Sequence, residues 1–409
     1  MRWLDGDPEA DAAREQYRQA HPDATSSPET PVALWDAGDD EEDIPPRGWL
    51  LGNTFCRGFI SSVLAEGGTG KTALRIAQVL ALASGRPLTG EHVFQRCRCL
   101  LVSLEDGRDE LRRRVRAAMR FYNLAPADIR GWLYLAVPGP AGGKLATTEN
   151  GAHRTGPLAE WLHNEIGRLD LDLVSLDPLV KAHGVEENAN NAVDFVAGIL
   201  SQIAIEHDVA VDVPHHVSKG ASDPGNANRG RGASAFKDAA RLVYTLTAMS
   251  PEEAEQFGIS PDSRRRFVRV DNAKTNVCPP SAAKWFELVG VPIDNRTKIY
   301  PHGDEIQVAR PWSPPETWTG LSTEALNAAL DEIDAGLPSG QRYSSSSAAT
   351  DRAPWTVVQK HCPDKGEGQC RDIVKTWLKN HVLYQEEYKD PISRKTLKGL
   401  RVDGTRRPS

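Results

Sequence analysis

Short apolar runs alternate with amphipathic stretches along the middle of the chain, and this pattern predicts an α/β fold. The runs are nearly continuous in Val, Ile and Leu, as is typical of strands buried on both faces of a parallel sheet. The stretches between them carry apolar residues at helical spacing. The predicted strands are 59–64, 99–104, 171–177, 209–213, 242–246, 267–271 and 284–288, and the predicted helices are 73–83, 109–119, 157–168, 191–207 and 236–241. We therefore expect a mostly parallel sheet with helices on both faces and ligands at the carboxyl ends of its strands.

The regions on either side of this α/β domain, which is expected to span 45–300, have a different character. Residues 1–44 are rich in Ala, Asp, Glu, Pro, Ser and Thr, which predicts a disordered acidic leader. The proline-rich residues 301–319 are interpreted as a linker. The pattern of 320–409 predicts helices followed by a hairpin: 324–333, 355–361 and 370–380, then 382–386 paired with 397–402. That order is typical of a winged helix-turn-helix, a unit that binds DNA or docks on proteins, and the sequence leaves the two roles open.

A glycine-rich turn joins the strand 59–64 to the helix 73–83. It reads Glu66-Gly67-Gly68-Thr69-Gly70-Lys71-Thr72-Ala73, close to the pattern G-x-x-x-x-G-K-[ST], with Ala65 in place of the first glycine. The backbone N–H groups of such a turn and the dipole of the helix bind phosphate. Lys71 is expected to reach the β- and γ-phosphates of ATP, and the Thr72 hydroxyl to bind Mg²⁺. An ordinary glycine turn is the other interpretation, but the strand–turn–helix context favours nucleotide binding.

Acidic and imidazole side chains follow the neighbouring predicted strands. Asp177 ends one apolar run and is the candidate for holding Mg²⁺. Glu105 ends another and is the candidate general base that orients a water at the γ-phosphate. Asp106 competes for that role, and a helix N-cap is its alternative. His215 and His216 follow a third strand, where either could contact the γ-phosphate. Asp212 also lies inside a predicted buried strand, and the sequence gives no reason for it.

The amino-acid composition says less about the function of the protein than these motifs do. The 409 residues carry a net charge of −7, but the C-terminal end is basic, so the sum does not exclude a local groove for nucleic acid. The six cysteines have neither disulfide nor metal spacing, which suits a reducing compartment. No apolar run is long enough to span a bilayer, and the first residues lack an apolar signal core. We therefore expect a cytoplasmic protein without a membrane partner.

Several motifs in fixed order resemble those of the RepA-type replicative helicases of plasmids and phages, a RecA-like family of ring-forming ATPases. The matching segments lie between residues 45 and 300 and are Ala65 to Thr72, Leu104-Glu105-Asp106, Leu176-Asp177-Pro178, His215-His216 with Lys219-Gly220, and Arg231 to Ala235 with Asp238 to Arg241. The resemblance implies a RecA-like fold and a homohexamer that binds ATP between subunits and single-stranded DNA in its channel. Ala65 departs from many relatives and bears on nucleotide affinity.

The same resemblance implies roles for individual residues. The ATPase residues would be Lys71, Thr72, Glu105 and Asp177, with His216 as the sensor of the γ-phosphate. Arg241 would be an arginine finger given to the ATP of the neighbouring subunit, and Lys274 could assist it. The loop that carries Lys219, Arg229 and Arg231 would face DNA.

Three functions remain open at this point. The first is a DNA helicase or translocase. The second is a RecA-like DNA-binding ATPase that acts in recombination or regulation without unwinding. The third is a DNA-binding regulator in which the winged helix dominates and ATP controls oligomerisation.

Overall fold

The computed structural model divides the chain into two compact units. It describes residues 35–139, 142–186, 189–217, 224–227, 234–279, 281–315 and 321–408, together with Ala12, Gln16 and Gln19. The first unit comprises Met1–Ala248 and Arg266–Trp312, and the second comprises Met249–Arg265 and Ser313–Ser409. The predicted leader, 1–44, thus lies largely outside the described residues.

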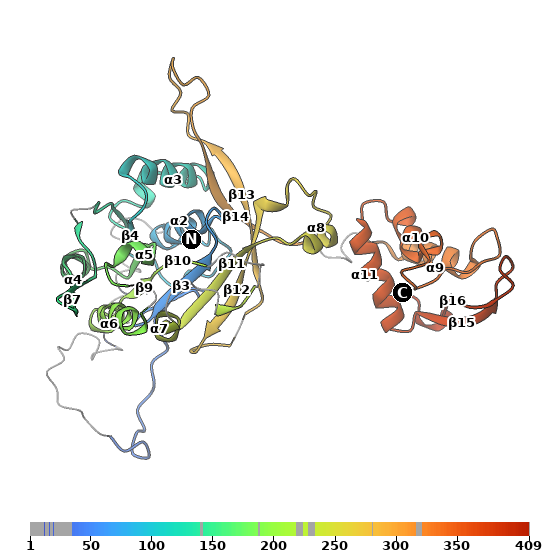
Figure 1. Ribbon diagram of the computed structural model, residues 1–409, viewed down its shortest axis with the longest axis horizontal. Coiled ribbons are helices and arrows are strands. Elements are labelled where there is room, and N and C mark those ends of the chain that lie inside the picture. The colour runs from blue at the N-terminus through green and yellow to red at the C-terminus, as the bar shows by residue number, and fades with distance from the viewer. Residues whose placement is uncertain are drawn as a thin grey trace. The chain divides into compact units, whose positions relative to one another are not determined.

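A large sheet forms the centre of the first unit, with the strand order β14-β13-β12-β11-β3-β9-β8-β4-β5 and β10 paired to the end of β3 (Figure 1). From β11 to β5 neighbouring strands are parallel, and β11 to β14 are joined antiparallel. The strands are β3 (Ile60–Ala65), β4 (Cys99–Ser103), β5 (Leu133–Ala136), β8 (Leu173–Asp177), β9 (Ala210–Asp212), β10 (His215–His216), β11 (Leu242–Ala248), β12 (Phe267–Thr275), β13 (Lys284–Pro292) and β14 (Glu305–Trp312). The predicted α/β fold with a mostly parallel sheet is confirmed.

Helices cover both faces of this sheet because its strands are apolar on both sides. In β4, Leu100 and Val102 face one hydrophobic cluster, whereas Cys99 and Leu101 face the other. The first cluster contains α4 (Pro157–Leu169), α6 (Asn190–Glu206) and α7 (Ser234–Ala239), and the second contains α2 (Lys71–Ser84) and α3 (Arg108–Phe121). Short elements complete the unit: β1 (Trp49–Leu51), β2 (Phe55–Cys56), β6 (Ala146–Glu149), β7 (Ala152–Thr155) and α5 (Leu179–Ala182).

The hairpin of β13 and β14 folds back over α2 and α3, although β14 is the edge strand of the sheet. Tyr122 at the end of α3 donates its hydroxyl hydrogen bond to the Ala309 carbonyl of β14. Arg113 of α3 forms an ion pair with Asp304 at 3.0 Å. The prediction of a linker over 301–319 is therefore wrong for 305–312, because this segment pairs with residues 285–292 of β13.

The second unit packs helices against a hairpin, in the predicted order. Its elements are α8 (Pro251–Phe257), α9 (Thr323–Ala335), α10 (Pro354–His361), α11 (Glu367–Lys379), β15 (Leu383–Lys389) and β16 (Thr396–Val402). Leu330, Ile373 and Leu400 share one apolar core, which joins α9, α11 and β16. The winged-helix identity of this unit stays a prediction. The domain bounds differ from expectation, because α8 comes from between β11 and β12 yet packs on α11, where Gly368 allows close approach to Gln256.

A buried polar network accounts for Asp212, which the sequence left unexplained. Arg75 of α2 forms an ion pair with Asp212 at 2.7 Å, and both residues are at most 1% exposed. Ser175 of β8 donates to the second carboxylate oxygen of Asp212 at 2.8 Å. The network continues from Arg75 to Gln78 and from Gln78 to Glu91. It therefore fastens the helix α2 to the middle of the sheet.

The Arg75–Asp212 pair gives a stability prediction. Asp212→Asn should lower the free energy of unfolding of the first unit by about 3–5 kcal/mol, because it leaves the Arg75 charge buried without its partner. The measurement is urea unfolding followed by tryptophan fluorescence and circular dichroism. The double variant Arg75→Met/Asp212→Asn should recover part of the loss, since no buried charge remains.

The matched control is Glu165→Gln, which breaks an exposed pair with Arg168 on α4. It should change the urea midpoint little, because exposed ion pairs are screened by water and salt. An Asp212→Asn protein that unfolds at the wild-type midpoint would rule out a stabilising role for the buried pair.

Candidate nucleotide site

The glycine-rich turn forms an open cradle between β3 and α2. Gly68 and Gly70 have φ angles of +79° and +91°, which side-chain-bearing residues rarely adopt. A Cβ atom on Gly70 would also lie 2.6 Å from Cδ2 of Leu288. Ala65, which departs from the usual motif, is the buried last residue of β3 and pairs with Leu246, so it occupies ordinary strand backbone. The turn therefore keeps glycine where its backbone needs it.

Lys71 and Thr72 begin α2 and point toward the end of β8. The Thr72 hydroxyl donates to Asp177 Oδ2 at 2.7 Å. Burial raises the pKa of the Asp177 carboxyl, while the charge of Lys71 and the hydrogen bond from Thr72 oppose the rise. Burial lowers the pKa of the Lys71 amine, and Asp177 and Glu105 oppose that change. A hydroxyl and a carboxylate are the oxygen ligands that suit Mg²⁺, so these residues fit the predicted ion.

His216 lies between Lys71 and Glu105. Its Nδ1 is 3.4 Å from Lys71 Nζ, and its Nε2 is 3.7 Å from Glu105 Oε1. If Nδ1 accepts from the Lys71 ammonium, the ring proton is on Nε2 and faces Glu105. The predicted sensor His216, the lysine Lys71 and the candidate base Glu105 are therefore neighbours.

Asp106 differs from its neighbour Glu105. Its carboxylate forms an ion pair with Arg114 of α3 at 2.9 Å, and its backbone N–H donates to Ser103 Oγ. The helix N-cap is Gly107, so Asp106 is not the cap that the sequence allowed. Glu105 has a side chain 47% exposed to the pocket and solvent. Of the two candidates for the base, Glu105 has the more accessible carboxylate.

One pocket contains the predicted nucleotide residues together with side chains that the sequence did not indicate. The predicted ones that line it are Glu66, Gly67, Gly68, Gly70, Lys71, Thr72, Ala73, Glu105, Asp106, Asp177 and His216, whereas Thr69 of the turn does not line it. Arg114 and Gln307 line the pocket as well. The sequence shows Arg114 as one of several arginines on a predicted helix, with nothing to distinguish it from the others. Gln307 could not be predicted as a pocket residue, because its position depends on the folding of β14 over α2.

Arg241 does not join this pocket. Its side chain is exposed, and its N–H donates to the Ile60 carbonyl at the amino end of β3. The cradle follows the other end of β3, roughly 16 Å away along the strand. Lys274 lies at the same end as Arg241, where its Nζ donates to the Asp238 carbonyl at 2.8 Å. The predicted DNA-contacting residues Lys219, Arg229 and Arg231 lie outside the described residues.

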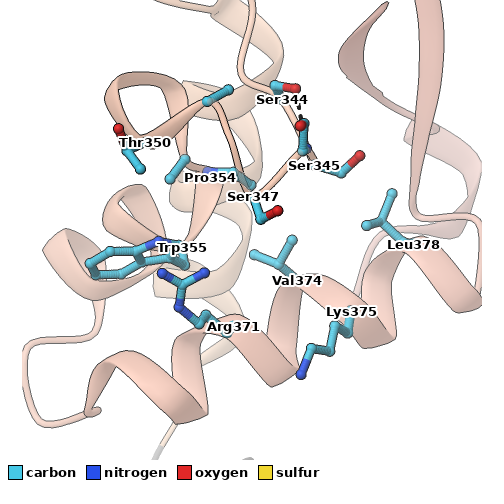
Figure 2. A pocket seen from close by; sticks show the side chains of 13 residues that line it. Ser344, Ser345, Ser347, Thr350, Pro354, Trp355, Arg371, Val374, Lys375 and Leu378 are labelled. Atoms are coloured by element: carbon cyan, nitrogen blue, oxygen red, sulfur yellow. Dashed lines mark hydrogen bonds between the residues drawn. The ribbon is translucent and has the colours of Figure 1, made fainter.

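The second unit has a pocket of its own, of about 260 Å³ (Figure 2). Trp355 of α10 lies beside Arg371 of α11, whose guanidinium is 4.9 Å from the ring centroid. Lys375 follows one turn later on α11, and the segment Ser344–Ser347 forms the opposite wall. Arg371 also pairs with Glu367 at 2.6 Å and Lys375 with Asp372 at 3.1 Å, so both cations already have acidic partners on α11.

A comparison with protein families matches residues 25–222 to the model of an AAA domain. The matched segment contains the glycine-rich turn, Glu105, Asp177 and His216, and it ends before Arg241. Together with the geometry of the turn, the match supports a P-loop NTPase domain, and nucleotide use follows from that class.

Two solved structures are similar to this chain at low identity. A DnaB-like replicative helicase, solved for its interactions with primase, is 16% identical with a TM-score of 0.41, covering 61% of this chain and 59% of its own. The RadB recombinase is 15% identical with a TM-score of 0.36, covering 57% of this chain and 89% of its own. The chain thus spans less than two thirds of the helicase, and neither likeness decides its function.

Among the described residues, no helix is both long and apolar enough to cross a membrane.

The different surroundings of Glu105 and Asp106 predict different effects of mutating them. Glu105→Gln should lower ATP turnover by about 10²–10⁴-fold while nucleotide binding persists, because the amide cannot accept a proton. Asp106→Asn is the matched control, and it should retain most turnover because its carboxylate pairs with Arg114. Steady-state phosphate release and binding of a fluorescent ATP analogue measure the two effects. The assignment reverses if Asp106→Asn is the inactive variant.

Proposed function

We propose that this protein is an ATP-dependent DNA helicase or translocase that hydrolyses Mg-ATP between the subunits of a ring. The observation that carries the proposal is the convergence of Lys71, Thr72, Asp177, Glu105 and His216 on one pocket. The ring, its hexameric state and the single-stranded DNA substrate are inferred from the motif resemblance. Residues Lys219, Arg229 and Arg231 remain the proposed DNA contacts.

In the proposed hydrolysis of ATP, each pocket residue has its own role. Lys71 and the backbone of Gly68 and Gly70 hold the phosphates, and Thr72 with Asp177 would hold Mg²⁺. When bound, Mg²⁺ neutralises charge on the β- and γ-phosphates. Glu105 accepts a proton from the attacking water, and His216, between Glu105 and Lys71, is placed to detect the loss of the γ-phosphate.

The position of Arg241 supports the assignment of its role to a neighbouring subunit. It is exposed and lies at the opposite end of β3 from the cradle, so it does not reach the pocket of its own chain. A ring built head to tail brings two different surfaces of one chain together. Arg241 would then complete the site of the next subunit, with Lys274 beside it.

The alternative of a DNA-binding regulator controlled by ATP rests on the second unit. Its pocket is lined by Arg371, which stacks on Trp355, and by Lys375. If the protein is such a regulator, removal of the two cations should abolish duplex binding, and the wild-type protein should show no strand displacement. The recombination-type ATPase would instead bind single-stranded DNA and leave a forked duplex intact.

Strand displacement on a forked duplex is the deciding test. The wild-type protein should release the displaced strand only with Mg-ATP, and single-stranded DNA should stimulate its ATPase activity. Lys71→Ala is the control without nucleotide binding. ATP turnover that is insensitive to single-stranded DNA would argue against a DNA motor of either kind.

Mixed oligomers test the shared site. Arg241→Ala and Lys71→Ala should each be inactive alone, yet a 1:1 mixture should regain activity. In roughly a quarter of its interfaces an intact P-loop would meet an intact Arg241. The mixture of Lys71→Ala with Glu105→Gln is the matched control and should stay inactive, since both lesions fall in the same half of the site. Activity of Arg241→Ala alone would exclude the finger role.

A further inference from the structure

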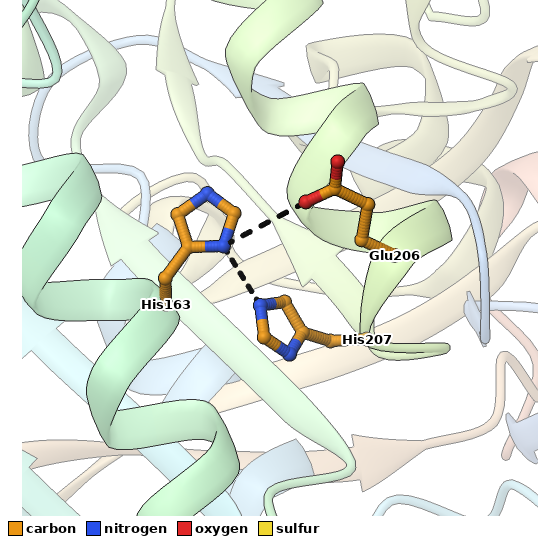
Figure 3. A group of neighbouring side chains, drawn as sticks. All are labelled: His163, Glu206 and His207. Carbon is orange, nitrogen blue, oxygen red and sulfur yellow. Dashed lines mark hydrogen bonds and ion pairs between the residues drawn. The ribbon is translucent and has the colours of Figure 1, made fainter. Parts of the chain in front are cut away.

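Three metal-binding side chains lie together on the face of the sheet covered by α4 and α6 (Figure 3). His163 comes from the middle of α4, Glu206 is the last residue of α6, and His207 follows it. His163 Nδ1 lies 2.8 Å from His207 Nε2 and 3.9 Å from Glu206 Oε2. All three residues are half-buried, and one ligand atom from each lies within 4.8 Å of the other two.

These distances suit one small ion. A tetrahedral metal with ligands at 2.0–2.1 Å holds its ligand atoms about 3.3 Å apart. The distance from His163 Nδ1 to His207 Nε2 is shorter than that value, and the distance to Glu206 Oε2 is longer. To reach that value, the two imidazole nitrogens would move apart by about half an ångström and the Glu206 carboxylate would approach His163 by about the same amount, which side-chain rotations supply.

Neighbouring groups orient the ligands. Gln202, one turn before Glu206 on α6, donates from Nε2 to Glu206 Oε1 at 2.6 Å, which leaves Oε2 directed at His163. The N–H of His207 donates to the Ile203 carbonyl, so the backbone of this residue is fixed as the end of the helix. The carboxyl end of a helix carries partial negative charge and favours a cation. Ligands supported in this way are typical of metal sites.

We propose that His163, Glu206 and His207 bind a divalent transition metal, Zn²⁺ by preference. Two imidazoles and one carboxylate are ligands for zinc, whereas Mg²⁺ and Ca²⁺ prefer oxygen alone. Three protein ligands leave the fourth position to water. Both imidazoles bind through the nitrogens that face each other, so the proton now shared between those nitrogens moves to the outer nitrogen of one ring.

The ion would connect two helices that lead into adjacent strands. The chain passes from α4 into β8 and from α6 into β9, so a link between the helices constrains the two strands at their amino ends. The nucleotide cradle lies at the opposite, carboxyl ends. The site is therefore separate from the proposed ATPase chemistry, and we expect it to raise thermal stability without changing basal turnover.

Metal titration of the full chain tests the site. Wild-type protein should bind Zn²⁺, and Co²⁺ as a spectroscopic probe should give visible absorption of a tetrahedral nitrogen and oxygen site without the near-ultraviolet bands of cobalt–thiolate bonds. Zn²⁺ should also raise the melting temperature. His163→Ala and His207→Ala should lose the Co²⁺ spectrum and the thermal shift. Gln202→Ala should bind about 10-fold more weakly, because it removes the group that orients Glu206.

Two controls make the result decisive. His302→Ala removes an exposed imidazole from outside the cluster and should bind as wild type. The ATP turnover of each variant reports whether the protein is folded, independently of the metal. Absence of Co²⁺ absorption in the wild type, or an unchanged spectrum in His163→Ala, would overturn the proposal and leave a hydrogen-bonded histidine pair only.

Discussion

The ion pair between Arg75 and Asp212 is the constraint on which the rest of the first unit depends. Arg75 lies one turn after Lys71, so the two side chains share a face of α2. Because Arg75 is tied to β9, the rotation of α2 about its own axis is set. Asp212 in turn accepts from Ser175 of β8, the strand that ends in Asp177. The contact between Thr72 and Asp177 across the pocket therefore depends on a pair buried beneath it.

The same network reaches the hairpin that covers the helix. Gln78 donates to Glu91, and Glu91 also accepts from Thr89 and from Lys284 at the start of β13. A carboxylate buried at this depth is tolerated only with several donors. These bonds hold the hairpin against α2, and the hairpin then brings Leu288 to Gly70 and Gln307 into the pocket. A polar core of this kind contributes less to net stability than to fixing one arrangement of the parts.

Local pattern predicted most of the elements and the composition of the pocket. Apolar runs marked β3, β4 and β8, and the glycine turn with its following helix marked the cradle. The carboxyl ends of parallel strands share one edge of a sheet, which is why Glu105, Asp177 and His216 could be grouped from sequence. Pairing between distant segments could not be predicted in the same way. Strand β14 lies within the proline-rich segment that was interpreted as a linker, and only its pairing with β13 makes it part of the sheet.

The expected bounds of the first domain, 45–300, are wrong at α8 for the same reason. The sequence of this helix lies between two strands of the sheet, so chain order assigns it to the first unit, but its packing partner is more than a hundred residues later at Gly366 and Gly368. Asp212 is a further case. A lone carboxylate in an apolar strand is unexplained until the arginine that faces it is known. The position of Arg75 in the sequence does not predict that it pairs with Asp212.

The exposure of Glu105 is relevant to the proposed ring. Its side chain is nearly half exposed, whereas Asp177 is buried. A general base open to bulk water cannot select one water for attack, and its electrostatic effect on the phosphates is weakened by solvent. In the proposed ring, a neighbouring chain beside Glu105 would exclude water and supply positive charge in one step. The proposal assigns that charge to Arg241, which lies at the far end of β3 from its own pocket.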